Sequence, residues 1–67
     1  MRSLDRDVLQ ELRDHPLGID ADDIASNLWE DKWNVEEALD RLQRDGRCDD
    51  YCGNYQATVR GEYELRY

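Results

Sequence analysis

The sequence contains no phenylalanine, one lysine, one proline and one histidine, and no apolar run longer than a few residues. The lack of a long apolar run excludes a membrane-spanning helix and a secretory signal within these residues, so we expect a cytoplasmic protein that does not enter membranes. The chain has 67 residues, which suits one domain with a small core and leaves no room for a large substrate pocket. We therefore expect a single domain over residues 1–67.

The sequence also lacks the residue sets on which enzymes depend. It has no glycine-rich phosphate loop and no combination of serine, histidine and aspartate typical of nucleophilic catalysis. Cys48, Cys52 and His15 are three candidate zinc ligands, whereas a structural zinc site needs four. Two cysteines four residues apart in one strand are too distant for a disulfide, so we interpret Cys48 as a small buried hydrophobic residue. We expect no enzyme activity, cofactor, metal site or small-molecule substrate.

Acidic residues are what the sequence has in excess. Seventeen aspartates and glutamates against nine lysines and arginines give a net charge of −8, and most of the acids are aspartate. High charge with low hydrophobicity is typical of disorder, but here the apolar residues are regularly spaced. An aspartate-rich, lysine-poor surface is also typical of proteins that stay soluble in concentrated salt. We expect a halophilic archaeon as the source, with an ordinary acidic domain as the alternative.

Apolar residues recur at helical spacing in three segments. They are Leu4, Val8, Leu9 and Leu12, then Ile24, Ala25 and Leu28, and finally Val35, Ala38, Leu39 and Leu42. Ser3 is the expected N-cap of the first helix, which Pro16 ends, and Asp20 opens the second. The third helix has two alternative N-caps, Asp31 and Asn34.

The period changes after Gly46. Residues 47–52 and 55–58 are predicted to form two short strands around a turn at Gly53–Asn54. Beyond them, residues 59–67 alternate between apolar and charged side chains, which indicates a strand, while a short helix beginning near Thr58 is an equal alternative. The predicted fold class is α+β and mainly helical, with three helices followed by a C-terminal hairpin.

This order of elements resembles a winged helix-turn-helix domain. The spacing from Ile24-Ala25 to Leu42 is similar to the two-helix unit of that superfamily, and Tyr55, Thr58 and Gly61 are similar to its ending, in which the threonine caps a last helix. Within the superfamily, residues 4–9, 24–28 and 55–61 resemble the small haloarchaeal group named after the phage phi-H repressor. The resemblance implies a sequence-specific, repressor-like transcriptional regulator whose third helix enters the major groove of duplex DNA.

The predicted DNA contacts come from the third helix and the wing. They are Lys32, Trp33, Asn34, Arg41, Arg44, Asn54 and Arg60. Asn34 can pair with adenine, while Arg44 and Arg60 suit phosphates. The alternative is that these cations are solvated and paired with neighbouring acids, as the spacing of Glu37 with Arg41 and of Asp40 with Arg44 favours.

Departures from the superfamily pattern suggest a second function. Glu36, Glu37 and Asp40 place acid on the helix that would meet phosphates, so the alternative is a winged-helix protein interaction module that does not bind DNA. Trp29 stands where the superfamily usually has glycine, and we expect it in the core, whereas Trp33 is either on the recognition face or in the core. We also expect a homodimer surface, for which the candidates are Val59, Tyr63, Leu65 and Tyr67.

Overall fold

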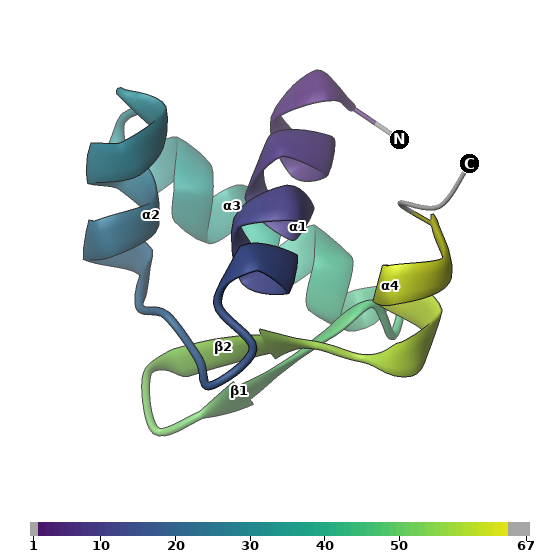
Figure 1. Cartoon of the computed structure of the whole chain (residues 1–67). Coiled ribbons are helices and arrows are strands. Elements are labelled where there is room, and N and C mark those ends of the chain that lie inside the picture. The colour runs from purple at the N-terminus through teal and green to yellow at the C-terminus, as the bar shows by residue number, and fades with distance from the viewer. Residues whose placement is uncertain (1, 65–67) are drawn as a thin grey trace.

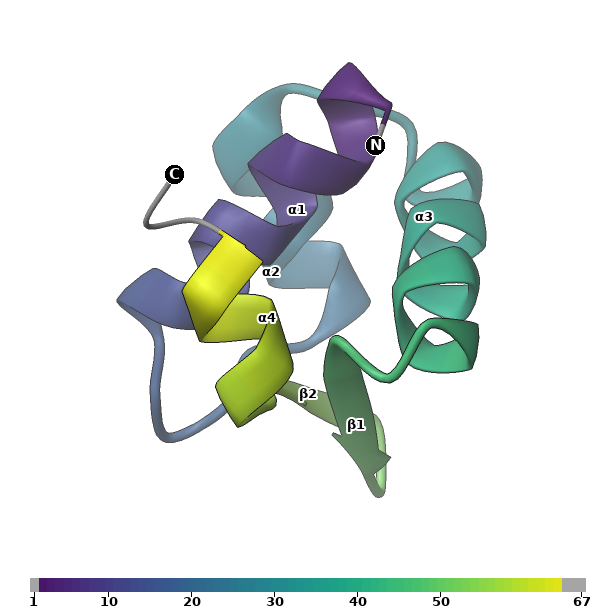
Figure 2. The same cartoon turned by 90° about the vertical axis from the view of Figure 1, so that its right-hand side faces the viewer.

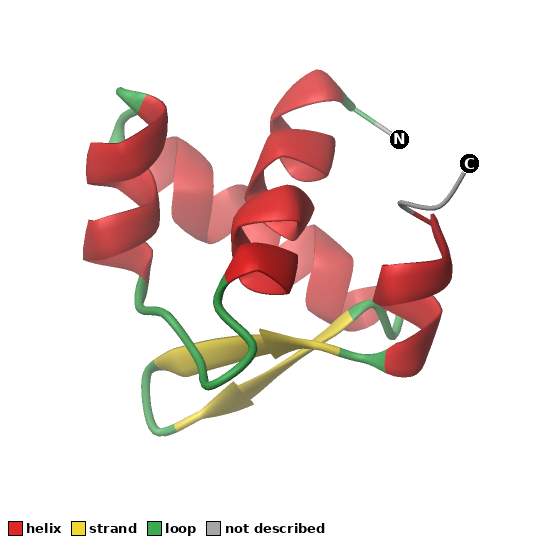
Figure 3. Ribbon diagram, viewed as in Figure 1, coloured by secondary structure: helices red, strands yellow, loops and turns green. Residues whose placement is uncertain are grey.

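The protein is mainly helical, with three helices before a two-stranded antiparallel sheet. The computed structural model describes residues 2–64, the last three by their backbone alone. The elements are α1 (Ser3–Asp14), α2 (Ala21–Leu28), α3 (Lys32–Arg44), β1 (Cys48–Tyr51), β2 (Asn54–Ala57) and α4 (Val59–Glu64). The hairpin lies along one side of the three helices (Figures 1 and 3). The predicted class, α+β and mainly helical with a hairpin after the third helix, is confirmed.

Helix α1 begins at Ser3, the residue that was expected to be its N-cap. Ser3 is already helical, and Arg2 takes the N-cap position without a side-chain cap, so the prediction of Ser3 as N-cap is wrong. At the other end the Nδ1–H of His15 donates to the carbonyl of Glu11 at 2.8 Å. This bond satisfies one of the carbonyl groups that a helix terminus leaves without a helical partner.

Aspartates begin the next two helices. The side chain of Asp20 accepts a hydrogen bond from the N–H of Asp23 at 2.8 Å, and that of Asp31 accepts one from the N–H of Trp33 at 2.7 Å. Each bond pairs one of the free N–H groups at a helix start. Of the two alternatives for α3, Asp31 is therefore the N-cap and Asn34 lies inside the helix.

Trp29 ends α2 in a left-handed conformation, with φ 55° and 95% of its surface exposed. The prediction that Trp29 belongs to the core is wrong. The chain leaves α2 through this residue, so its side chain follows neither the buried stripe of α2 nor that of α3. Glycine suits such a position best because a Cβ atom makes the left-handed conformation costly.

The hairpin turns one residue earlier than predicted. Tyr51 pairs with Asn54, so the turn residues are Cys52 and Gly53 rather than Gly53 and Asn54. Both have positive φ, 54° and 88°, as the tight two-residue turn of a type I′ hairpin requires. The side chain of Asp50 accepts a bond from the N–H of Gly53 at 2.9 Å, which holds the turn closed.

Residues 59–64 form the helix α4, which confirms the helical alternative for this stretch. The hydroxyl of Thr58 accepts a bond from the N–H of Gly61 at 3.2 Å and donates to the carbonyl of Gly46 at 2.6 Å. A Cβ atom on Gly61 would overlap the carbonyl oxygen of Arg47. Helix α4 therefore packs closely on the start of the hairpin, and only glycine fits at this contact.

One apolar core joins α1, α2 and α3 to the hairpin. The predicted helical stripes form most of it, and Leu4 and Leu28 pack at its edge. Its buried members are Val8, Leu9, Leu12, Ile19, Ala21, Ile24, Ala25, Val35, Ala38, Leu39, Leu42 and Cys48. Ile19 also exchanges two backbone hydrogen bonds with Tyr55, so the segment before α2 pairs with the edge of β2 that faces away from β1.

Candidate binding surface on the third helix

Helix α3 buries one side in the core and exposes the other to solvent. The exposed side carries Trp33, with 68% of its surface accessible. Together with Glu36, Glu37 and Asp40 the indole lines a shallow hollow of about 170 Å³. We call these four residues the outer face of α3. Its chemistry is one large aromatic ring among three carboxylates.

Lys32, at the start of α3, is held by acids on two helices. Its ammonium lies 3.1 Å from a carboxylate oxygen of Asp22 and 3.8 Å from one of Glu36. The hydrogen bond to Asp22 raises the pKa of Lys32 above its ordinary value, and the charges of Glu36 and Asp20 act in the same direction. The lysine therefore stays charged, and its charge is shared among carboxylates of this chain.

A second hollow, of about 230 Å³, lies between α2, α3 and the hairpin turn. Its lining residues are Asp20, Ala21, Asp22, Lys32, Glu36, Gly53 and Tyr55. The fold thus brings Lys32 to the hairpin turn, and Asn54 follows that turn directly with an exposed side chain. Burial, followed by the charge of Asp50, raises the pKa of the Tyr55 phenol. Lys32 is the single cation among the residues that line the two hollows, against five carboxylates.

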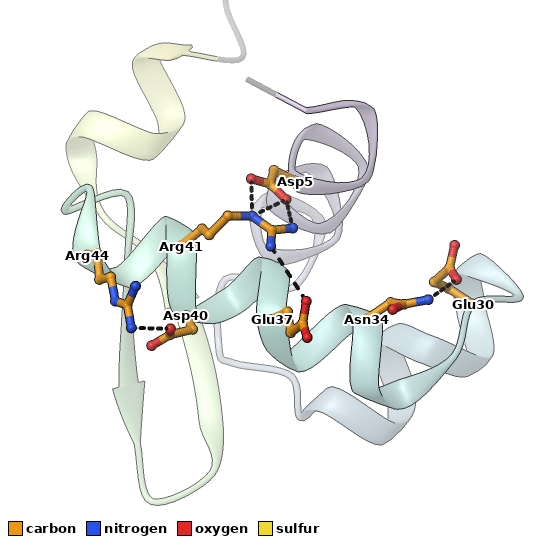
Figure 4. A network of polar contacts seen from close by, with 7 residues as sticks. All are labelled: Asp5, Glu30, Asn34, Glu37, Asp40, Arg41 and Arg44. Carbon is orange, nitrogen blue, oxygen red and sulfur yellow. Dashed lines mark hydrogen bonds and ion pairs between the residues drawn. The ribbon is translucent and has the colours of Figure 1, made fainter.

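The arginines of α3 are also paired. Arg44 contacts Asp40 at 2.9 Å along the helix surface, where both side chains are more than half exposed. Arg41 approaches Glu37 at 3.9 Å. Figure 4 shows both pairs on α3, one turn apart. These are the pairs that the spacing favours, and exposed pairs of this kind contribute little to stability.

A salt bridge with a buried carboxylate joins α3 to α1. The guanidinium of Arg41 donates to both carboxylate oxygens of Asp5, at 3.2, 3.0 and 2.7 Å, and Asp5 is buried. Figure 4 shows Arg41 reaching from α3 toward α1. The hydrogen bond to Asp5 raises the pKa of the Arg41 guanidinium. The Nε–H and Nη2–H groups of one planar guanidinium thus donate to a single carboxylate, and this paired geometry holds α1 and α3 rigidly together.

Asp5 did not figure among the residues that the sequence singles out, although a signal for it exists. Asp5 stands three residues before Val8 and four before Leu9, on the apolar stripe of α1. An acid on a buried stripe needs a cationic partner. The sequence does not reveal that this partner is Arg41, because the two residues are 36 positions apart and no local spacing rule connects them.

The remaining predicted contacts do not converge on one surface. The side-chain amide of Asn34 donates to Glu30 at 3.1 Å, across the turn between α2 and α3. Arg60 is exposed in the first turn of α4, which lies at the opposite end of the molecule from α2 (Figures 1 and 2). Lys32, which is paired with Asp22 of α2, and Arg60 of α4 therefore lie at different ends of the protein.

Both cysteines are free thiols in different surroundings. Cys48 is fully buried in the core, which confirms its interpretation as a small hydrophobic residue, and Cys52 is exposed in the hairpin turn. Burial, with the charges of Asp49 and Asp50, raises the pKa of the Cys48 thiol to about 12. Among residues 2–61, whose side chains the structure describes, no cluster of three or more histidine, cysteine or acidic side chains is placed to hold a metal ion.

Of the four candidates for a homodimer surface, the structure describes one side chain. Val59 is 70% exposed in the first turn of α4. Tyr63 lies in α4 and is described by its backbone alone, and Leu65 and Tyr67 lie outside the described residues. The homodimer therefore stays a prediction.

No protein-family model, curated protein or solved structure matches the chain. Among the described residues, no helix has both the length and the apolar character that crossing a membrane requires.

Proposed function

We propose that the chain is a winged helix-turn-helix regulator that binds duplex DNA with α3, as the resemblance to the phi-H repressor group implies. The observation that supports this most is the arrangement of α2 and α3. Three residues connect them, a hairpin follows, and the side of α3 away from the core is left exposed. In helix-turn-helix proteins the second helix of such a pair enters the major groove.

The charge of the outer face predicts an unusual response to salt. Glu36, Glu37 and Asp40 repel phosphates over a Debye length of about 10 Å at 0.1 M salt, and over about 3 Å at molar salt. Ordinary DNA-binding proteins lose affinity as salt rises, because their cations release ions from the DNA. Here the cations of α3 are already paired with acids, so this release is small. We expect DNA affinity to increase toward molar KCl.

Titration of the protein against labelled fragments of genomic DNA at several KCl concentrations tests the proposal. Binding that strengthens with KCl and selects particular fragments supports a regulator. The absence of binding to any duplex from about 0.1 M to molar KCl, with the protein folded throughout, would sink it.

Two charge variants show whether α3 is the contact. Glu36→Gln with Glu37→Gln removes two repulsive charges from the outer face and should strengthen nonspecific binding at moderate salt. Asp7→Asn with Asp14→Asn removes the same charge from α1 and is the matched control. Equal gains in the two variants would mean that net charge alone matters and that α3 is not the contact.

A second candidate is a winged-helix interaction module that does not bind DNA. The observation in its favour is that Lys32, Arg41 and Arg44 are each ion-paired within the chain, while the hydrophobic ring of Trp33 stays exposed. Large exposed aromatic surface is typical of protein contacts. Folded protein that fails to bind duplex DNA at every salt concentration favours this candidate.

A further inference from the structure

The hollow on the outer face of α3 has unused capacity to accept hydrogen bonds. Glu36 and Glu37 lie 3.8 and 3.9 Å from their cations, longer than a direct hydrogen bond. Those cations have closer partners, because Lys32 is held by Asp22 at 3.1 Å and Arg41 by Asp5 at 2.7 Å. The side chains of Glu36 and Glu37 are about half exposed. Both carboxylates therefore keep free oxygen lone pairs beside the hollow.

Trp33 supplies the second element of the site. Its indole is 68% exposed and shares the hollow with the carboxylates, so an aromatic face and anionic acceptors are presented together. A guanidinium group uses both, since it stacks on an indole face and donates in its plane to carboxylates. An ammonium is a compact, strongly hydrated point charge that cannot stack in this way. The hollow of about 170 Å³ is of the size of one long side chain rather than of a folded surface.

We propose that this hollow is a docking site for an arginine side chain on an extended, basic segment of a partner protein. Charge complementarity identifies the occupant, because no cation lines the hollow and the chain carries a net charge of −8. The arginine stacks on Trp33 and donates to Glu36 and Glu37. Asp40 is already engaged with Arg44 at 2.9 Å and forms the far edge. Binding of such a segment is a function beyond DNA binding and does not depend on it. A segment docked here covers the side of α3 that DNA would approach.

The chain offers a direct spectroscopic probe, since it contains two tryptophans. Trp29→Phe leaves Trp33 as the single indole, and its fluorescence and its indole N–H resonance then report on the hollow. The probes are three short, blocked, glycine-spaced peptides that carry two arginines, two lysines or two citrullines. Titrations in low salt and in molar KCl separate stacking from long-range attraction.

We expect the arginine peptide to shift the Trp33 signals and to bind about fivefold more tightly than the lysine peptide, a difference of about 1 kcal/mol. The citrulline peptide, which keeps the shape but lacks the charge, should not bind. Glu36→Gln with Glu37→Gln should weaken arginine binding at least about fivefold, whereas Asp7→Asn with Asp14→Asn should change it less than about twofold.

Equal affinity for the arginine and lysine peptides, or equal losses in the two charge variants, would overturn the proposal in favour of nonspecific attraction to an acidic protein. Unchanged Trp33 signals at saturating arginine peptide would overturn it as well. Circular dichroism of each variant confirms that the fold is kept. Because no DNA is present, failure here leaves the proposed regulator function untouched, and failure of the DNA titration leaves this site untouched.

Discussion

The buried thiol of Cys48 makes the stability of the fold sensitive to alkaline pH. Cys48 has no exposed surface, and its Sγ–H points to the carbonyl of Leu39 at 3.7 Å. Burial and the charges of Asp49 and Asp50 raise the pKa of the thiol from 9.0 to about 12. In the unfolded chain the same thiol loses its proton near pH 9.

At alkaline pH the folded and unfolded states bind different numbers of protons, and this difference sets the direction in which stability changes. Between pH 9 and about 12 the folded protein keeps a proton that the unfolded chain has lost, so rising pH favours unfolding. One unit of pKa difference corresponds to about 1.4 kcal/mol. At about pH 10.5 the thiol is therefore expected to have lowered the free energy of unfolding by about 2 kcal/mol, whereas well below pH 9 it causes no such loss.

Denaturant unfolding measured from about pH 8 to 10.5 tests this. Cys48→Ala should flatten the fall in stability by about 2 kcal/mol over that range, although the variant starts from a lower value because it leaves a small cavity. Cys52→Ala is the matched control, because Cys52 is exposed in the hairpin turn and should leave the slope unchanged. The same slope in the parent and in both variants would refute the reasoning.

Four further changes probe other parts of the fold. Leu39→Ala removes a side chain that is 1% exposed in the middle of α3 and should cost roughly 2–5 kcal/mol in denaturant unfolding; a loss below about 1 kcal/mol would contradict its place in the core. Trp29→Gly should leave stability unchanged or raise it by up to about 1 kcal/mol, because it relieves a left-handed conformation at little cost in packing, and a clear loss would show that the indole packs. Asp5→Asn should lower the melting temperature, since it weakens the tie to Arg41, while the exposed Asp7→Asn should not. Melting temperatures should rise from low to molar KCl, because salt screens repulsion among the many acids, and a flat or falling series would count against halophilic adaptation.

The helices of the core were predictable because burial and helical geometry share one period. The stripe of Val35, Ala38, Leu39 and Leu42 has the spacing that places apolar side chains on one side of a helix, and all four are buried. The change of period after Gly46 likewise indicated the hairpin. The local rule failed at the turn itself. Type I′ geometry needs positive φ at two successive residues, and Cys52 gives no sign of adopting it.

The features that could not be predicted from the sequence depend on tertiary contacts. Large aromatic residues are usually buried, so Trp29 was expected inside, but the end of α2 requires a left-handed residue, and the backbone turns this one toward solvent. The alternation after Thr58 suits a strand, yet Gly61 must lie against the carbonyl of Arg47, and the helical turn brings it there. The link between Asp5 and Arg41 spans 36 residues and exists only after α1 and α3 pack.

We expect the salt concentration to decide which of the two proposed ligands, a basic protein segment or DNA, binds the outer face of α3. An interaction that depends on stacking against Trp33 and on short hydrogen bonds to Glu36 and Glu37 is expected to survive screening, because in both the groups are in direct contact. Repulsion between the same carboxylates and phosphates acts over a Debye length and is lost in molar salt. We therefore expect low salt to favour a basic protein segment on α3 and high salt to admit DNA to the same surface. Measured against KCl, the two affinities should change in different ways, with DNA binding rising and arginine binding falling only by its long-range part. A parallel rise or a parallel fall would mean that the two ligands do not share this face.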